Sequence, residues 1–371
     1  MSQPKLFSPV QLGRVRLAHR VVLAPLTRQR ADAKHVHSEL AVEYYEQRAS
    51  VSGTLLISEG TLVAAKASGV AHVPGIWNDK QIAAWKRITD AVHAKGSYMY
   101  CQLWAVGRNV FPDVLEEEGF PYVSASNIPL KELSITPRPL SLEEIKEYVQ
   151  LFATAAINAV DRAGFDGVEV HCANGYLIDQ FIQDVSNNRT DEYGGSVANR
   201  CRFALEVIDA VCKAVGEDRT GVRVSPWSEF GDMGMENPEP TFSYFARELV
   251  ARHPKLAYLH ATEPRISGAV DRQGRANESN DFLRDIWSPR PFISAGGFTR
   301  ESALEVAEEK GDIVAFGRWF ISNPDLPLRL RKNIPLTKYN RATFYSPGLA
   351  EGYTDYPFAG SLDIRKEELL N

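Results

Sequence analysis

The sequence predicts an α/β protein built as a single (β/α)8 barrel, with elaborated loops after its third and sixth strands. Eight short apolar runs rich in β-branched residues recur along the 371 residues, and helix-length segments separate them. The runs are apolar on both faces, as parallel strands are when helices sheathe the sheet. Because barrels of this kind commonly run past ~250 residues as one unit, we expect one domain over residues 1–371.

The eight apolar runs define the predicted strands. In chain order they are Arg20–Leu26, Gly53–Gly60, Ser97–Trp104, Gly167–Ala173, Thr220–Pro226, Ala257–Thr262, Pro291–Gly297 and Asp312–Arg318. Their short length and β-branched content favour strands over buried helices.

The segments between the runs carry recognisable helix ends. The predicted helices run from Asn78 or Asp79 to Lys95, from Ser141 to Gly164, from about Ser196 to Ala214, and from Thr299 to near Gly311. Ser141 and Glu144 have the spacing of a capping box, and Gly164 is a typical residue to end the helix that they open.

Two segments break the alternation of strand and helix. Residues 108–140 hold several prolines, and residues 263–281 are polar and rich in arginine and glycine. Both are predicted to be loops at the carboxyl end of the barrel. The last forty residues hold four tyrosines and exceed what eight strand-helix units require. We expect them to fold back over the barrel.

Composition and charge argue against several classes of protein. Hydrophobic residues make up 44% of the chain and charged residues 24%, as in an ordinary soluble enzyme. A net charge of −5 with scattered basic residues argues against binding to nucleic acid. No apolar run approaches the ~18 residues of a membrane span, so we expect a cytoplasmic protein with no membrane partner.

Neither a metal site nor a disulfide is expected. The four cysteines show no C-x-x-C spacing, and we expect them to be reduced packing residues, with Cys172 partly exposed. His35 and His37 alternate in a loop that has no cysteine nearby in the sequence. Solvated side chains are therefore expected there in preference to a metal site.

Catalytic groups of such a barrel lie where the strands end at its carboxyl face. Gly296-Gly297 ends the seventh strand and Gly317-Arg318 the eighth. Glycines allow close approach of a phosphate, the helices that follow present N–H groups, and an arginine adds a charged fork. Gln102 offers an amide donor and acceptor, and Arg223 can place positive charge near an electron-rich ring. Together they predict a phosphorylated, redox-active heterocycle at the barrel mouth.

The fourth strand ends in three side chains suited to proton chemistry. His171, Asn174 and Tyr176 follow an apolar, β-branched run. The imidazole and the amide can donate hydrogen bonds, and the phenol can give up a proton. This combination predicts a reaction site at the end of the strand.

Each of these residues also has an ordinary structural interpretation. A single histidine such as His171 is more often a satisfied structural residue, and a pair of glycines marks many tight turns. Tyr176 and Tyr345 can be simple packing residues. Arg223 is harder to dismiss, because an unpaired buried guanidinium is costly. Its structural alternative is a salt bridge inside the barrel.

Longer motifs narrow these alternatives. The most specific are APLTR at residues 24–28, CQLW at 101–104 and HCANGYLIDQF at 171–181, joined by DEYGGS at 191–196, FGR at 316–318 and GYTDYP at 352–357. Together they resemble the old yellow enzyme family, the FMN-dependent ene-reductases, from Leu6 to Phe358. The details resemble fungal members, including the branch that acts in ergot-alkaloid synthesis, and also plant 12-oxophytodienoate reductases.

The resemblance implies FMN as the cofactor of this barrel domain and NADPH, with NADH as the alternative, as its reductant. It implies contacts to the flavin ring by Pro25, Leu26, Thr27, Gly60, Gln102, His171 and Arg223, and to the phosphate by Gly296, Gly297, Gly317 and Arg318. Three arginines of the loop after the sixth strand, Arg265, Arg272 and Arg275, could meet the 2′-phosphate of NADPH or be solvated charges.

The resemblance also implies a small-molecule enone or enal as substrate and a monomer or homodimer as the assembly. His171 and Asn174 would bind its carbonyl oxygen, and Tyr176 would donate the proton. Trp104 and Tyr345 resemble pocket walls, with Trp227 and Phe298 as further candidates. Asn174 stands where other members carry a second histidine, which changes the donor geometry but keeps the role.

Two other functions remain open. A flavin-independent isomerase, aldolase or decarboxylase would need a lysine for a Schiff base or paired carboxylates, and the strand ends offer neither, with Glu59 as the nearest carboxylate. A flavin-binding barrel with a non-catalytic role is the other, and the presence of Tyr176 argues against it.

Overall fold

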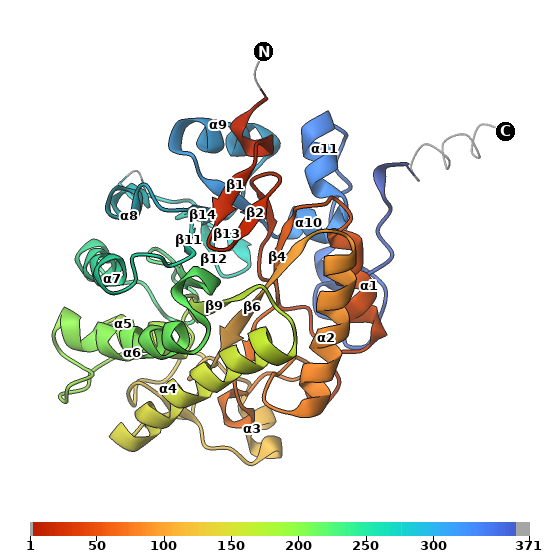
Figure 1. Cartoon of the computed structure of the whole chain (residues 1–371). Helices are drawn as coiled ribbons and strands as arrows, with labels where there is room; N and C mark the ends of the chain where they lie inside the picture. The colour runs from red at the N-terminus through yellow and green to blue at the C-terminus, as the bar shows by residue number, and fades with distance from the viewer. Residues whose placement is uncertain (1–2, 276, 361–371) are drawn as a thin grey trace.

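A closed ring of eight parallel strands forms the centre of the computed structural model, which describes residues 3–275 and 277–360 (Figure 1). Its strands are β3 (Val21–Leu23), β4 (Leu55–Ile57), β6 (Tyr98–Trp104), β9 (Gly167–Cys172), β10 (Thr220–Val224), β11 (Tyr258–Thr262), β14 (Phe292–Ala295) and β15 (Ile313–Phe316). One strand falls inside each predicted run, and the predicted barrel is confirmed. The ends of the predicted domain, residues 1–2 and 361–371, lie outside the described residues.

Hydrogen bonding between neighbours closes the ring. Its order is β4, β3, β15, β14, β11, β10, β9 and β6, and β6 pairs in parallel with β4 to complete the circle. A further short strand, β5 (Thr61–Leu62), pairs with the end of β6. The carboxyl ends of all eight strands therefore meet at one mouth, where side chains from distant parts of the sequence can converge.

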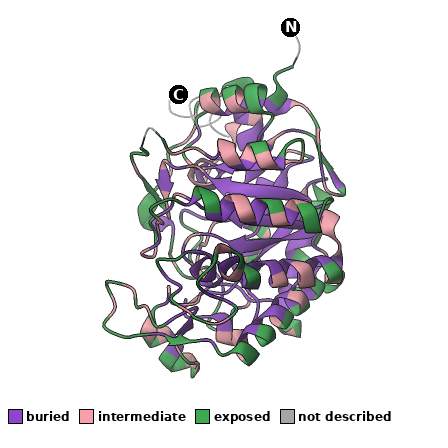
Figure 2. Cartoon of the chain, turned by 90° about the vertical axis from the view of Figure 1, so that its left-hand side faces the viewer, coloured by how far each residue is buried: buried purple, intermediate pink, exposed green. Residues whose placement is uncertain are grey.

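Helices surround the ring with their exposed faces outward, while the strands are almost entirely buried (Figure 2). They are α1 (Glu39–Arg48), α2 (Asp79–Ala94), α4 (Leu142–Ile157), α6 (Val197–Val215), α7 (Glu239–Arg252), α8 (Asp281–Trp287), α9 (Arg300–Lys310) and α11 (Leu326–Lys332), with the shorter α5 (Leu177–Ile182) and α10 (Arg318–Ser322). None of the helices among the described residues is long and apolar enough to cross a membrane.

The predicted helix ends are mostly where the capping residues place them. The capping box of α4 is present, because the Ser141 side chain accepts from the Glu144 N–H and the Glu144 side chain accepts from the Ser141 N–H. The helix continues as one π-helical turn, Asn158–Arg162, and Gly164 follows in a left-handed conformation. The predicted helix from Ser141 to Gly164 is therefore α4 together with this turn.

A hairpin near the N-terminus closes the amino end of the barrel, and the sequence analysis missed it. β1 (Val10–Leu12) and β2 (Val15–Leu17) pair antiparallel. Leu12, Val15 and Leu17 are buried in one apolar cluster with Tyr100 and Tyr258, whose strands form part of the ring. Strands of three residues carry too little alternation to be recognised without this packing.

The two predicted loops follow β6 and β11, the third and sixth strands of the ring, as expected. Both contain secondary structure that the sequence analysis did not predict. Residues 108–140 include α3 (Pro112–Glu118) and the paired β7 (Val123–Ser124) and β8 (Arg138–Pro139). Residues 263–281, of which residue 276 is not described, include the hairpin of β12 (Ile266–Ser267) and β13 (Val270–Asp271).

The N-terminal hairpin should contribute measurably to stability. Leu17→Ala removes a fully buried side chain from the cluster and should lower the free energy of unfolding by about 2–5 kcal/mol. Arg16→Ala, at the exposed position between the two buried residues of β2, should change it by less than about 0.5 kcal/mol. Urea unfolding followed by circular dichroism measures both. If the free energies of unfolding of the Leu17→Ala and Arg16→Ala variants were equal, the hairpin would not be part of the core.

Candidate active site

A cavity of about 1100 Å³ opens at the carboxyl end of the barrel. Of the predicted site residues, those that line it are Pro25, Leu26, Thr27, Gln102, Trp104, His171, Asn174, Tyr176, Arg223, Gly296, Gly297, Gly317, Arg318 and Tyr345, together with Phe298. Six strands of the ring, β3, β6, β9, β10, β14 and β15, carry all of these residues except Tyr345 on themselves or just after their ends. The structure thus brings nearly the whole predicted set around one space.

Gly60 lies behind the cavity wall. It is absent from the described lining residues, and a Cβ at this position would be 2.8 Å from Cε3 of the Trp104 ring. The glycine is therefore needed for Trp104 to pack closely against the end of the second strand. Its predicted contact with a flavin ring stays a prediction.

Two polar side chains form part of the inner end of the cavity. Gln102 projects from β6 and Arg223 from β10, and both are buried. Nε of Arg223 has no hydrogen-bond partner, and no carboxylate among the described residues lies within ion-pair distance of its guanidinium. The structural alternative, a direct salt bridge to Arg223 inside the barrel, is therefore not found among the described residues. The guanidinium is available to a ligand.

The three residues predicted at the end of the fourth strand lie together in the cavity. The ring of His171 lies 5.2 Å from that of Tyr176 in an edge-to-face arrangement, and Trp104 lies 4.9 Å from Tyr176 on another side. Nδ1 of His171 and Nε1 of Trp104 are buried without hydrogen-bond partners.

A tight turn sets the direction of Asn174 and Tyr176. Asn174 has a φ of 56°, and its N–H donates to Oγ of Ser225 at 2.7 Å. The N–H of Gly175 donates to a carboxylate oxygen of Asp179 at 2.9 Å. Ser225 and Asp179 are supporting residues that the sequence analysis missed, and nothing local in the sequence distinguishes Ser225.

The electrostatic surroundings keep His171 and Tyr176 uncharged. Burial lowers the pKa of His171 well below its ordinary value, and the positive charge of Arg223 acts in the same direction. Burial raises the pKa of Tyr176, and its neighbour Tyr345 adds to this. Near neutral pH the site therefore presents a neutral imidazole and a protonated phenol.

Glycines line the part of the cavity predicted to hold a phosphate. Gly296 and Gly297 have φ values of 122° and 64°, and a Cβ on Gly317 would lie 3.0 Å from the Leu26 side chain. In the first turn of α9, the N–H of Ser302 donates to the Thr299 side chain in a capping box, so this N–H already has a partner in the protein. Arg318 forms an ion pair with Asp271 on the β12–β13 hairpin, with Nη1 and Oδ2 2.8 Å apart.

Buried arginines hold the segment of residues 340–356, which we call the C-terminal strap. Arg28 donates to the carbonyl oxygens of Phe344 and Gly352 at 3.2 and 2.8 Å. Arg30 donates to four strap carbonyls, those of Thr343, Phe344, Leu349 and Glu351, at 2.8–3.2 Å. The strap carries Tyr345, which is 51% exposed and lines the cavity. The expectation that the last residues fold back over the barrel therefore holds for the strap.

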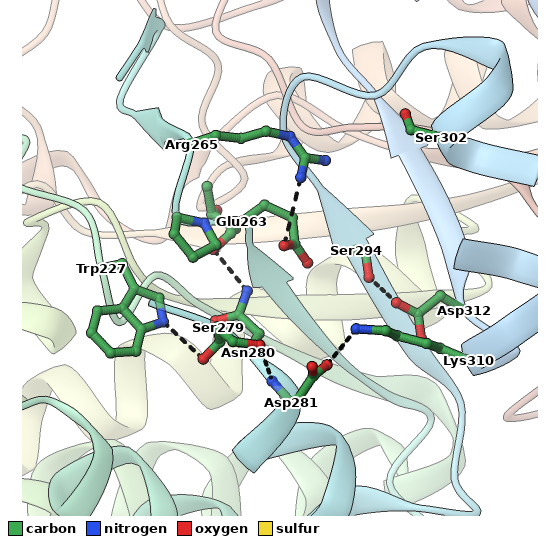
Figure 3. Close-up of polar contacts among 12 residues, drawn as sticks. Trp227, Glu263, Arg265, Ser279, Asn280, Asp281, Ser294, Ser302, Lys310 and Asp312 are labelled. Atoms are coloured by element: carbon green, nitrogen blue, oxygen red, sulfur yellow. Dashed lines mark hydrogen bonds and ion pairs between the residues drawn. The ribbon is translucent and has the colours of Figure 1, made fainter. Parts of the chain in front are cut away.

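The loop after β11 is tied down by its own polar groups (Figure 3). Nε1 of Trp227 donates to the carbonyl oxygen of Ser279, and Nδ2 of Asn280 donates to that of Thr262. Arg272 donates to the carbonyl oxygen of Trp227 at 3.0 Å and to Glu278 at 2.8 Å. Arg272 is thus an internal support of the loop, and Trp227 does not line the cavity as was considered.

Two other expectations from the sequence are wrong. Cys172 is fully buried, not partly exposed, and burial raises the pKa of its thiol well above the ordinary value. His35 and His37 are buried, not solvated. Nδ1 of His35 lies 2.7 Å from the carbonyl oxygen of Val73, and Nε2 lies 3.0 Å from the carboxylate of Glu118, which is distant in the sequence.

Comparison with known proteins agrees with this geometry. Residues 5–337 match the NADH:flavin oxidoreductase / NADH oxidase family. The chain belongs to this family. The Old Yellow Enzyme of a Pichia species, whose crystal structure is known, has 37% sequence identity and a TM-score of 0.89, covering 96% of this chain and 94% of its own. The chain is thus an old yellow enzyme-type FMN oxidoreductase on a (β/α)8 barrel.

Similar fungal proteins differ in their described activity. Chanoclavine-I aldehyde reductase fgaOx3 of Penicillium roqueforti is 53% identical over 360 residues, and the NADP-dependent oxidoreductase lnbE of Aspergillus flavus is 49% identical over 366. A protein of Claviceps fusiformis called a probable inactive dehydrogenase, easA, is 47% identical over 367 residues. Each alignment covers 96% of this chain and 96% of the relative.

The cavity suits the FMN that this family uses. Its inner wall combines apolar residues from the first and eighth strands with an unpaired buried guanidinium, Arg223, and an amide, Gln102. Three glycines, Gly296, Gly297 and Gly317, also line the cavity, and a Cβ on any of them would crowd a neighbouring side chain. An apolar floor with a polar edge fits a flavin ring, and a glycine cradle beside an arginine fits its phosphate.

The arginine contacts predict how the strap responds to mutation. Arg30→Ala leaves several strap carbonyls without a donor, and hydrogen bonds to charged groups contribute about 1.5–3 kcal/mol each. Hydrogen–deuterium exchange of residues 340–356 should become at least about tenfold faster, which corresponds to about 1.4 kcal/mol. The control is Lys338→Ala, an exposed position for which the described structure has no hydrogen bond or ion pair. Unchanged exchange in Arg30→Ala would mean that other contacts hold the strap.

Proposed function

We propose that this protein is an ene-reductase, an enzyme that reduces the activated C=C bond of an α,β-unsaturated aldehyde or ketone with FMN and NADPH. The observation that carries the proposal is the convergence of His171, Asn174 and Tyr176 on the cavity that Gln102 and Arg223 also line. Two potential donors and one acid thus face the space next to the proposed flavin bed. An enone or enal needs this combination.

The first task of the site is to polarise the substrate carbonyl. His171 and Asn174 are the proposed donors, and the buried Nδ1 of His171 has no partner in the protein. Negative charge develops on the carbonyl oxygen as the β-carbon accepts hydride, so donors held in place stabilise the transition state more than the ground state. Removing one such donor typically costs about 3 kcal/mol.

The second task is to deliver a proton to the α-carbon. Tyr176 is the proposed acid, and its phenol stays protonated because burial raises its pKa. A weak acid is adequate here, since the carbon that receives the proton is strongly basic. Trp104 and His171 pack against the Tyr176 ring from two sides and restrict its motion.

FMN, when bound, would supply the hydride. The residues proposed to hold its ring are Pro25, Leu26, Thr27, Gly60, Gln102, His171 and Arg223, and those proposed for its phosphate are Gly296, Gly297, Gly317 and Arg318. All except Gly60 line the cavity. We propose that the barrel over residues 1–371 acts as one FMN-binding domain.

NADPH is the proposed reductant, with NADH as the alternative. Support comes from the relative described as an NADP-dependent oxidoreductase. The contacts of Arg272 within its own loop argue against a role in binding the 2′-phosphate. Arg275 is mostly exposed and Arg265 partly so, which leaves both as candidates.

An aldehyde is the proposed physiological substrate. The support is the chanoclavine-I aldehyde reductase of Penicillium roqueforti, which is similar over nearly its whole length. Trp104, Phe230 and Phe344 line the cavity and provide aromatic surface for a hydrophobic enal. We propose that the protein acts on such an enal in fungal secondary metabolism.

A catalytically silent flavin-binding barrel is the second candidate, because one similar protein is described as a probable inactive dehydrogenase. The presence of Tyr176 and its enclosed position favour activity. A flavin-independent aldolase has less support, since no lysine is among the described residues that line the cavity. Glu59, the carboxylate considered for such chemistry, is buried outside the lining and accepts the N–H of Arg28.

The test of the proposal uses the purified protein. Its absorption spectrum should show bound flavin, NADPH should bleach the flavin band, and cyclohexenone or cinnamaldehyde should restore it with formation of the saturated product. Protein that binds FMN and is reduced, but never reduces either alkene, would support the silent barrel. Protein that takes up no FMN would overturn the proposal.

The role of Tyr176 predicts a separation of the two half-reactions. Tyr176→Phe should leave reduction of the flavin by NADPH within about threefold of normal, because that step needs no proton from the phenol. Alkene turnover should fall at least about tenfold, or 1.4 kcal/mol in the barrier. Stopped-flow absorbance measures each half-reaction. Tyr345→Phe, which removes another hydroxyl from the same cavity, is the control. If Tyr176→Phe reduced the alkene as fast as the unmodified protein and Tyr345→Phe do, water or another acid would supply the proton.

A further inference from the structure

A carboxylate lies directly behind the polar residues of the cavity. Glu169 is on β9, two residues before His171, and is fully buried. It is absent from the lining residues, whereas its neighbours Gln102 and Arg223 are among them. A buried carboxylate in an apolar strand is costly unless it has partners, so its contacts indicate why it is there.

Both oxygens of Glu169 accept hydrogen bonds from buried side chains. Oε1 lies 2.8 Å from Nε2 of Gln102, which is opposite Glu169 in the β6–β9 register. Oε2 lies 2.8 Å from Nδ1 of His260 on β11. A carboxylate can only accept, so the amide of Gln102 must turn its NH2 group toward Glu169. The carbonyl oxygen of Gln102 is then the group left for a ligand.

Glu169 also provides negative charge near Arg223. Burial alone would raise the pKa of the carboxyl group, but the interactions with His260, Arg223 and Gln102 outweigh it and hold the pKa below its ordinary value. Burial lowers the pKa of His260, which leaves this imidazole neutral. The negative charge of Glu169 therefore balances the positive charge of Arg223, while His260 stays neutral.

We infer that Glu169 is a positioning residue for the flavin: it orients the amide of Gln102 and compensates the charge of Arg223. The cavity then offers a hydrogen-bond acceptor at Gln102 and a cation at Arg223. An imide N–H of the flavin ring matches the acceptor, and the electron-rich ring atoms beside it match the cation. The inference rests on the proposed function only in taking FMN as the ligand.

Glu169→Gln tests both parts of the inference. A glutamine at 169 can donate to the oxygen of Gln102, so the amide can turn and present its NH2 group to the imide N–H. The dissociation constant of FMN, measured by fluorescence quenching on apoprotein, should rise at least about tenfold. The reduction potential of the bound flavin should become more positive, since Arg223 loses its counter-charge and favours the electron-rich reduced ring.

Two further variants separate positioning from simple stabilisation. Glu169→Asp keeps the negative charge, so the reduction potential of the flavin bound to this variant should stay near that in the unmodified protein. Asp312→Asn removes another buried carboxylate, one that bonds to Ser294 (Figure 3). It also pairs with Arg284, and both residues lie outside the lining of the cavity. The substitution should lower stability but leave FMN affinity and potential unchanged.

The outcomes distinguish this inference from the proposed function. A folded Glu169→Gln protein with unchanged FMN affinity and potential would overturn the inference, whether or not the protein reduces alkenes. If that variant does not fold, the double variant Glu169→Gln/Arg223→Gln removes both charges. Recovery of folding would support charge compensation, and failure to recover would overturn it. Unmodified apoprotein that takes up no FMN would overturn both proposals.

Discussion

Closure of the parallel sheet is the constraint on which the rest of the structure depends. Because β6 pairs back to β4, every strand has two neighbours, and no side chain inside the ring can reach bulk water through an open edge. Inward polar groups must therefore satisfy one another or a ligand. Gln102 and His260 both bond to Glu169, although Nε2 of His260 has no partner among the described residues. Arg223 and His171 line the cavity, and each also has a buried nitrogen without a partner.

The irregular backbone around the mouth of the barrel has carbonyl oxygens that also need hydrogen-bond donors. The C-terminal strap and the loops after β6 and β10 have few strand or helix partners, so buried arginines bond to their carbonyl oxygens. Arg28 and Arg30 do so for the strap, and Arg108 does so for the two loops through Ile128, Gly231 and Asp232. Arg28 follows Pro25, Leu26 and Thr27 in the same loop, and one short segment thus joins the proposed flavin bed to the outer wall.

Sequence alone predicted the parts of this structure that have local signals. The eight ring strands are apolar runs with recognisable ends, and the residues at those ends do meet in one cavity. The β1–β2 hairpin, α3 and the short strands of the loops were missed because each is only two to seven residues long. The strap carbonyls that accept from Arg28 and Arg30 lie more than 300 residues away in the sequence, where no local pattern reveals them.

Glu169 could have been found. It alternates with His171 on one strand, so both side chains face the inside of the barrel, and a glutamate in an apolar run is as unexpected there as Arg223 is in its own strand. The cost of a buried charge applies to the glutamate as much as to the arginine. Cys172 shows the opposite error, because alternation places it on the face that packs against the helices, where it is fully buried.

The left-handed backbone conformation of Asn174 limits which amino acids can replace it without a change of backbone path. Few residue types other than glycine occupy that conformation readily, and asparagine, aspartate and histidine are the most frequent of them. Exchange of asparagine for histidine therefore keeps the backbone path and alters only the reach of the side chain, whereas valine or isoleucine would displace the neighbouring Tyr176 as well. A variant library at this position that aims to change chemistry while keeping the fold is correspondingly small.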